Sequence, residues 1–299
     1  QGSTVVTQDG ANYSLTNIAV GFGAMVGNTT GTQNAALGYQ ALYSNTVGTN
    51  NVGLGGFALR SNTDGPGNVA VGLSALYNNT TGAYNIGIGL QALYTNTTGQ
   101  RNTAVGYQAI YSADGTIYNT AIGFQAMRLT TTGDRNTAVG YLSLSNTTTG
   151  FQNVAIGYGT LSVNTWGGNN SALGNNALAS NTTGNNSVAL GASALYFNST
   201  GSGNIGVGFS ALYSNKSGNN NTAVGYQALY TADGTAYNVA IGYRSLYNTT
   251  TGDYNTAVGY QSLYSNTTGT NAIAIGYQAL YNTDQTQYNL GIGYRALYN

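Results

Sequence analysis

A seventeen-residue repeat constrains this chain more than any other feature. The stretch Asn255 to Asn271, NTAVGYQSLYSNTTGTN, recurs along the sequence in steps of seventeen residues without an insertion or deletion. Sixteen complete units fill Asn17 to Tyr288, and a seventeenth runs from Asn289 to Asn299. A strict period of this length is typical of a solenoid, in which each unit forms one coil and stacks on the next. We therefore expect one repeat domain over residues 17–299, with residues 1–16 as an entry segment or cap.

Four positions of the unit hardly vary. Counting from position 1 at Asn255 to position 17 at Asn271, position 4 is Val, Ile or Leu in every copy and position 5 is always Gly. Position 9 is always Leu, Ile or Met, and position 3 is only Ala or Gly. The alternation at positions 2 to 6 predicts a strand with positions 2 and 4 facing the core. Positions 8 to 12 predict a second short strand with position 9 facing the core.

The expected fold is therefore all-β: an elongated parallel β-solenoid of about seventeen coils, with two short strands in each coil. A helical repeat is disfavoured, because an interior Gly costs about 1 kcal/mol in every unit. A unit of this length is also too short for two helices and their turns.

The composition argues against most catalytic chemistry. The chain contains no His, no Cys and no Glu, and its seven carboxylate side chains are all Asp. Without imidazole or thiolate groups we expect no enzyme, no metal site and no cofactor. Charged residues are 5% of the chain and balanced in sign, which argues against nucleic acid as a partner. No apolar run reaches twenty residues, so we expect no membrane insertion within this segment.

The absence of Cys is compatible with an oxidising, extracellular location. The chain begins at Gln1 without Met or an apolar leader, which suits a processed or excised fragment. An extracellular protein is the expectation that follows.

The small residues at positions 3 and 5 indicate a partner. If positions 2 and 4 face the core, positions 3 and 5 face outward, and a solvated strand face normally carries Thr, Ser, Lys or Glu rather than Ala and Gly. Gly at position 5 could alternatively serve an unusual backbone angle, but this does not explain position 3. A thin core also favours oligomerisation. The predicted oligomer interface includes Ala223, Gly225, Ala240, Gly242, Ala257 and Gly259.

The run NNSVALGASAL, Asn185 to Leu195, and the related runs NTAVGYQAL, Asn221 to Leu229, and NVAIGYRSL, Asn238 to Leu246, carry a family resemblance. The chain from Asn17 to Asn299 resembles the head repeats of trimeric autotransporter adhesins, which also occur in bacteriophage tail-fibre proteins. The resemblance implies a left-handed parallel β-roll and a homotrimer with the Ala/Gly positions at its axis. The unit here is longer and richer in Tyr than typical heads, and no stalk or membrane anchor is present in the given sequence.

Tyrosine is the distinctive residue, with 26 copies, most of them at positions 6 and 10. One interpretation is that they form ladders that stack along the coils and cover a thin core. The other is a ligand surface for glycans or proteins, because exposed Tyr provides contact area at low entropic cost. The candidate ligand surface is represented by Tyr226, Tyr230, Tyr243, Tyr247, Tyr260 and Tyr264.

The turns raise two weaker alternatives. Asn79-Thr80-Thr81 and Asn198-Ser199-Thr200 match the glycosylation acceptor pattern, although a repeat that needs Asn and Thr in its turns creates such matches automatically. Rows of Thr could match ice, but paired Thr in a turn makes a poor flat array. The Asp residues are scattered among turns, which argues against calcium sites.

Two classes of function remain. The first is a structural and adhesive fibre segment, on a cell surface or a virion, that binds surface glycans or matrix proteins multivalently. The alternative is a self-assembling extracellular filament without a specific receptor, because the last unit stops at Asn299 in mid-repeat and would expose strand edges.

Overall fold

The computed structural model describes residues 17–285 and 287–299. The predicted cap, residues 1–16, lies outside the described residues. The chain forms two compact units, Gln1–Gly150 and Phe151–Asn299, and each is described by itself.

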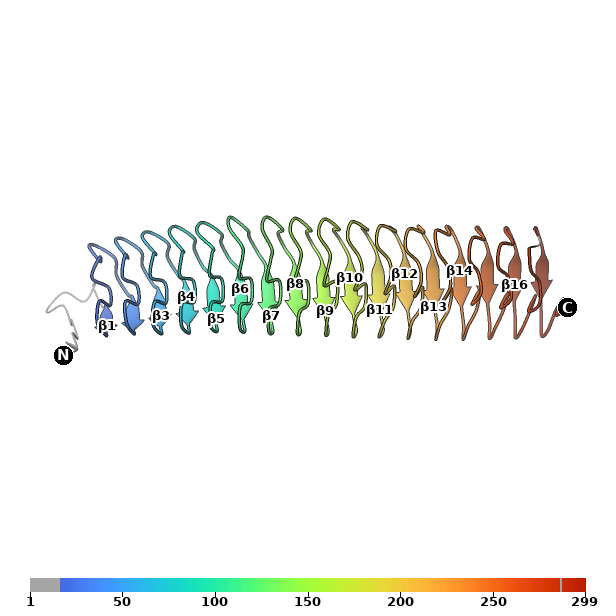
Figure 1. Cartoon of the computed structure of the whole chain (residues 1–299), viewed down its shortest axis with the longest axis horizontal. Helices are drawn as coiled ribbons and strands as arrows, with labels where there is room; N and C mark the ends of the chain where they lie inside the picture. The colour runs from blue at the N-terminus through green and yellow to red at the C-terminus, as the bar shows by residue number, and fades with distance from the viewer. Residues whose placement is uncertain (1–16, 286) are drawn as a thin grey trace. The chain divides into compact units, whose positions relative to one another are not determined.

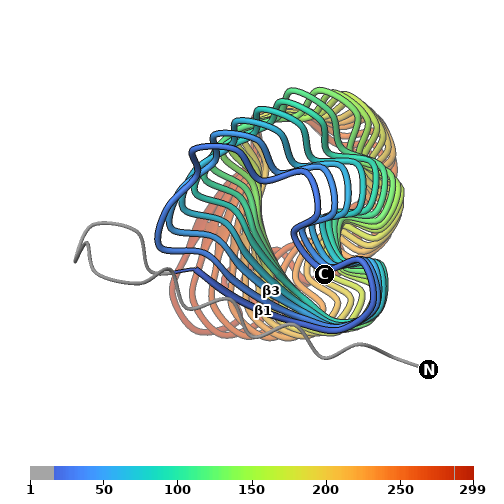
Figure 2. The same cartoon turned by 90° about the vertical axis from the view of Figure 1, so that its left-hand side faces the viewer.

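The described part of the first unit contains one three-residue strand in each coil (Figure 1). Each strand pairs in parallel with the strand one coil on, and equivalent residues lie side by side, as with Thr103 and Thr120. The coils of this unit, blue to green in Figure 2, repeat one outline. The strands are β1 (Ile18–Val20), β2 (Ala35–Leu37), β3 (Val52–Leu54), β4 (Val69–Val71), β5 (Ile86–Ile88), β6 (Thr103–Val105), β7 (Thr120–Ile122) and β8 (Thr137–Val139).

The second unit is built in the same way. Its strands also pair in parallel with a register shift of one coil, as with Thr222 of β13 and Val239 of β14. The described strands are β9 (Val154–Ile156), β10 (Ser171–Leu173), β11 (Val188–Leu190), β12 (Ile205–Val207), β13 (Thr222–Val224), β14 (Val239–Ile241), β15 (Thr256–Val258), β16 (Ile273–Ile275) and β17 (Leu290–Ile292). The predicted all-β parallel solenoid with seventeen-residue coils is confirmed.

The prediction of a second strand at positions 8 to 12 is wrong. That part of each coil forms tight turns, because positions 7 and 9 have a positive φ, as in Gln227 (φ 51°) and Leu229 (φ 50°). Extended backbone needs a negative φ, so a strand cannot pass through these two positions. The turns still bond to their neighbours along the stack: the N–H of Leu229 donates to the carbonyl of Ser245, and the N–H of Gln227 to the carbonyl of Phe209.

The predicted orientation of the first strand is also wrong. Position 3 is the buried position, and positions 2 and 4 point outward, as shown by Ala257 between the more exposed Thr256 and Val258. The interior consists of Ala at positions 3 and 8 together with the apolar residue at position 9, which was correctly predicted to face the core. A Cβ atom added to Gly206 at position 3 would lie 3.3 Å from the carbonyl oxygen of Ala211 and 3.3 Å from Cγ of Leu195. Position 3 is therefore restricted to Ala and Gly by the narrow interior, which is filled from its own coil and from the preceding one.

Two rows of buried asparagines complete the interior. At position 1, the Oδ1 of Asn221 accepts a hydrogen bond from the backbone N–H of Asn238 in the next coil, while the Nδ2 of Asn238 donates to the carbonyl of Gly252 in its own coil. At position 12, the Nδ2 of Asn198 donates to Oδ1 of Asn181 in the preceding coil. These amides satisfy backbone groups that would otherwise be buried without partners.

Candidate binding surfaces

The outer face of the sheet is lined with aliphatic side chains. In the described residues, position 4 carries Val, Ile or Leu in every coil, and these side chains are half-buried or exposed. Ile241 and Ile275 are each 40% exposed. A contiguous apolar face of this kind is unusual on a soluble monomer and marks an interaction surface. The sequence shows that position 4 is always aliphatic, but the prediction that it faces the core is wrong.

The predicted oligomer interface does not lie on this face. Ala223, Ala240 and Ala257 are completely buried inside their own coils, so they have no surface to offer another chain. The three glycines of the prediction, Gly225, Gly242 and Gly259, instead serve a backbone conformation with positive φ. The outward Ala/Gly strip is therefore withdrawn as an interface.

Position 5 needs glycine for the backbone alone. The φ angles of Gly225, Gly242 and Gly259 are 140°, 132° and 134°, a region that side chains with a Cβ rarely adopt. A Cβ atom on Gly242 would also lie 2.4 Å from the carbonyl oxygen of Gly259. The alternative interpretation, that Gly at position 5 serves an unusual backbone angle, is the correct one.

The tyrosines form the predicted ladders. At position 6, the ring centroids of Tyr226 and Tyr243 are 5.2 Å apart with an interplanar angle of 7°, and those of Tyr243 and Tyr260 are 5.1 Å apart. At position 10, Tyr230, Tyr247 and Tyr264 stack at 5.2 and 5.3 Å. The position 6 rings are the more exposed of the two rows. Stacking is thus confirmed, and one ladder also presents ring surface to solvent.

Polar side chains at position 7 lie beside the two ladders. The guanidinium of Arg244 lies 5.3 Å from the ring centroid of Tyr243 at position 6 and 5.2 Å from that of Tyr247 at position 10. Its Nε donates to Oε1 of Gln227 at 2.9 Å. Rings with amide groups beside them are the combination that contacts the faces and hydroxyls of neutral sugars.

Two tyrosines of the position 10 ladder, Tyr230 and Tyr281, have a raised pKa. Burial raises the pKa of Tyr230, and the neighbouring Tyr213, Tyr247 and Tyr226 raise it further. Tyr281 has a raised pKa for the same reasons, burial first and then Tyr264 and Tyr298 among its neighbours. Proximity of phenol groups along a ladder opposes ionisation because each phenolate would repel the next.

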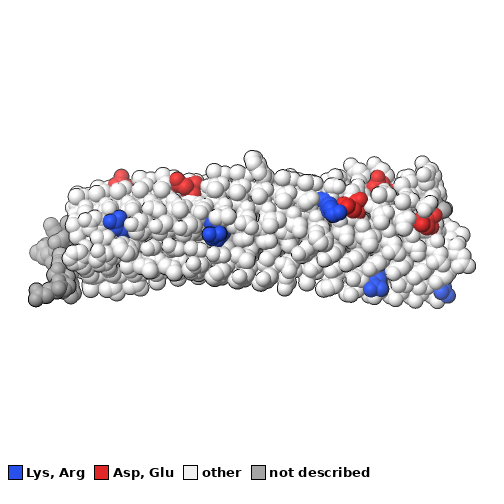
Figure 3. Space-filling view, in the orientation of Figure 1, with Lys and Arg blue, Asp and Glu red and all other residues white. Residues whose placement is uncertain are grey.

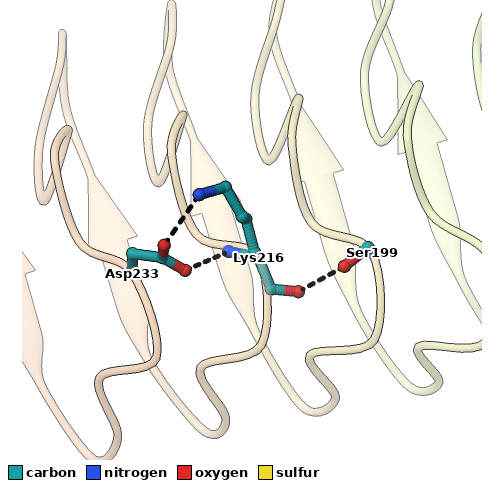
Figure 4. A network of polar contacts seen from close by, with 3 residues as sticks. All are labelled: Ser199, Lys216 and Asp233. Atoms are coloured by element: carbon teal, nitrogen blue, oxygen red, sulfur yellow. Dashed lines mark hydrogen bonds and ion pairs between the residues drawn. The ribbon is translucent and has the colours of Figure 1, made fainter.

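Charged groups are sparse. Figure 3 shows a face on which a few Lys, Arg and Asp side chains are scattered over an otherwise uncharged surface. In the second unit, Nζ of Lys216 lies 2.9 Å from Oδ2 of Asp233, and the carbonyl of Lys216 accepts a hydrogen bond from Oγ of Ser199 (Figure 4). The two ions are 63% and 44% exposed, so this pair contributes little to stability.

The part of the chain that the structure describes contains neither a metal-binding cluster nor a membrane-spanning helix. Within it, no cluster of three or more His, Cys, Asp or Glu side chains could hold a metal ion. The same residues include no helix with the length and hydropathy needed to cross a membrane.

The glycosylation acceptor patterns fall on buried side chains. Asn79 and Asn198 are completely buried, and their Nδ2 atoms, which an attached glycan would occupy, donate hydrogen bonds to the carbonyls of Gly82 and Gly201. In the folded coil these amides cannot be modified without breaking the asparagine row. The recurrence of Asn at position 12 was the signal for this internal role.

Comparison of the chain with models of protein families finds no match, and neither does comparison with curated proteins. The fold itself defines the class: the chain is a parallel β-solenoid of repeated seventeen-residue coils. This agrees with the repeated β-roll that the sequence resemblance implies.

Proposed function

We propose that this protein is an extracellular structural and adhesive fibre segment that assembles with copies of itself. The observation that carries the proposal is the outward row of Val, Ile and Leu at position 4, present in every described coil. Covering this row removes apolar surface from water, which is the main driving force for association of protein chains. The assembly proposed is a homotrimer, the number that the resemblance to adhesin heads implies.

A second copy of the chain fits this row better than an unrelated partner does. Side chains of one row repeat once per coil, at the spacing of about 4.8 Å between parallel strands. A copy of the same chain carries the same period, so aliphatic residues of both faces can interdigitate along the whole length of the contact. A globular partner would match such a row over a few coils only.

Adhesion is assigned to the exposed tyrosine ladder at position 6. Rings such as Tyr226, Tyr243 and Tyr260 repeat in consecutive coils, so each copy presents many equivalent, shallow sites. Linked weak contacts raise the overall avidity by about 10² to 10⁴ over a single contact. The ligands proposed are neutral surface glycans or matrix proteins, and their binding is expected to change little with salt.

A glycan array and a matrix-protein binding assay at low and high salt test this adhesive role. The expected result is weak, salt-insensitive binding that is lost when Tyr226, Tyr243 and Tyr260 are changed to Ser. The control removes two hydroxyl groups from the less exposed ladder at position 10, by Tyr230→Phe and Tyr247→Phe. This control should leave binding intact. Absence of binding to every glycan and matrix protein would reduce the proposal to a structural fibre, which is the self-assembling filament of the alternative.

The self-association itself is tested by thiol labelling. The natural chain contains no Cys, so Ile241→Cys or Thr251→Cys gives a protein with a single thiol. Thr251 lies on an exposed turn outside the sheet face. We expect Cys at position 241 to react slowly with a soluble thiol reagent in the assembled protein and Cys at position 251 to react fast. Equal rates at the two positions would mean that the aliphatic row is free in solution.

A further inference from the structure

In the compact unit Gln1–Gly150, position 17 of four consecutive coils forms a column in which Tyr and Arg alternate. Four consecutive coils place Tyr84, Arg101, Tyr118 and Arg135 there. The guanidinium of Arg101 lies 5.7 Å from the ring centroid of Tyr84 and 5.5 Å from that of Tyr118, so the cation lies between two rings. Rings on both sides orient the planar guanidinium and limit its motion.

The column faces solvent. Tyr84 is 57% exposed and Tyr118 is 47% exposed, and both arginines are also exposed. Position 17 has a positive φ in these coils, 58° in Tyr84 and 56° in Arg101. Most residues tolerate this conformation poorly and Gly or Asn prefer it. Other coils do use Gly or Asn here, as at Gly67 and Asn50, so large Tyr and Arg side chains are not required by the fold.

The positive charge of the column is not neutralised. Over residues 17–285 and 287–299 the ion pair within 4.0 Å is Lys216 with Asp233, which involves neither arginine of the column. The acidic residue next to Arg135 in sequence, Asp134, directs its Oδ1 to the backbone N–H of Ile117 at 2.7 Å. Two exposed guanidinium groups are therefore available to an anion.

The spacing between Arg101 and Arg135 indicates which kind of linear polyanion could bind to both. They are two coils apart, which corresponds to roughly 9.6 Å along the stack at about 4.8 Å per coil. This length is comparable with one disaccharide in an extended polysaccharide. Side chains on one face of an extended peptide instead recur every roughly 6.6 Å, so an acidic peptide strand would not match the column.

We propose that the column Tyr84, Arg101, Tyr118 and Arg135 binds an acidic polysaccharide that carries one anionic group per disaccharide. Each arginine binds a carboxylate or sulfate through a charged, fork-shaped pair of N–H groups. The exposed edges and hydroxyls of the intervening tyrosine rings contact the sugar rings between the anionic groups. This site is separate from the neutral glycan surface of the proposed function and does not depend on it, because it uses other coils, another position of the unit and charge.

The test measures binding of the full chain to immobilised hyaluronan, which has one carboxylate per disaccharide, with dextran as a neutral polysaccharide and polyglutamate as an acidic peptide. We expect hyaluronan to bind more tightly than either dextran or polyglutamate, and the hyaluronan binding to weaken as salt rises. Arg101→Gln with Arg135→Gln should weaken binding about tenfold or more, because charged hydrogen bonds are lost. The matched control, Lys216→Gln with Arg295→Gln, removes the same charge elsewhere and should bind hyaluronan as the natural chain does.

Three further variants separate the contribution of the tyrosine ring from that of the charge. Tyr118→Phe should keep binding and Tyr118→Ala should weaken it, while Arg101→Lys should bind between the natural chain and the glutamine variant. The mass of each variant in solution is measured in parallel and should not change. The proposal is overturned if the Arg101 and Arg135 double variant binds hyaluronan normally, if the control variant loses binding equally, or if polyglutamate binds as well. A double variant with altered mass would assign the column to contacts between chains instead, which also overturns it.

Discussion

The side-chain amide of Asn79 donates a hydrogen bond to Oδ1 of Asn62, 2.7 Å away in the preceding coil. Asn79 also donates to the carbonyl of Gly82 at 2.9 Å, and its own Oδ1 accepts from Asn96 at 2.9 Å. Position 12, which appears in the sequence as part of a polar turn, thus forms a hydrogen-bonded row that runs from Asn28 to Asn96 and ends at Ala113. The row ties these five coils together through side chains in addition to the parallel sheet.

Replacing Asn79 with Ala should destabilise the first unit. The change leaves Oδ1 of Asn62 buried without its partner and removes a hydrogen bond to Gly82, and an orphaned buried polar group costs about 1–3 kcal/mol. Thr81→Ala, at an exposed position 14 without a positive φ, is the control and should change the free energy of unfolding by less than about 0.5 kcal/mol. Urea unfolding of both variants gives the comparison, and equal stability would show that the row is dispensable.

Two glycines of the second unit should differ in how much a change to alanine lowers the free energy of unfolding. Gly242→Ala introduces a Cβ at φ 132° and 2.4 Å from the carbonyl oxygen of Gly259, so we expect a loss of about 1–3 kcal/mol or more. Gly206→Ala occurs at position 3, where most coils already carry Ala, and should be close to neutral. Thermal or urea unfolding distinguishes them, and a harmless Gly242→Ala would contradict the close approach of the coils at position 5.

The sequence predicts the coil length and the parallel stacking, because a strict period places each residue beside its equivalent one coil on. It does not predict which face is inside. Ala at position 3 suggested contact with another chain, whereas Ala223 is buried. At the equivalent Gly206, a carbonyl of the same coil and a leucine of the preceding coil leave no room beyond a Cβ atom. The tight turns at positions 7 and 9 could not be recognised either, since Gln227 and Leu229 are residue types that rarely adopt a positive φ. The stacking of Tyr226 on Tyr243 could be predicted, because identical side chains in register must lie side by side.

Alkaline pH should destabilise the tyrosine ladders. The pKa of Tyr230 and of Tyr281 is raised in the folded state, mainly by burial. Their contribution to stability is therefore complete below the pKa of an unfolded tyrosine and is lost as pH rises through the folded pKa. Tyr230→Phe with Tyr281→Phe keeps the ring contacts and removes these ionisations, so its stability should fall less at high pH. Unfolding curves across the alkaline range, with tyrosinate absorbance as the titration signal, measure this difference, and identical profiles would argue against it.

Deleting one whole coil should be tolerated. Removal of residues 221–237 joins Asn220 to Asn238 and keeps the sheet, the ladders and the asparagine rows in register, since stability in a solenoid depends mainly on contacts between neighbouring coils. Removal of residues 221–230 shifts the register of every following row and should prevent folding of the second unit. Circular dichroism and urea unfolding report the outcome. A chain that survives the ten-residue deletion better than the seventeen-residue deletion would contradict the coil as the structural unit.

The mass of the protein in solution, measured by sedimentation equilibrium, tests most directly whether the aliphatic face joins copies of the chain. We predict three times the 30.7 kDa of one chain for the natural protein. We predict a folded single chain when Ile241, Val258 and Ile275 on the face are changed to Lys, because a lysine buried between chains without a partner is costly. The control with Lys at the exposed turn residues Thr200, Thr251 and Thr268 adds the same charge and should remain a trimer. A natural protein that sediments as a single chain, or a face variant that keeps the trimer mass, would contradict the account.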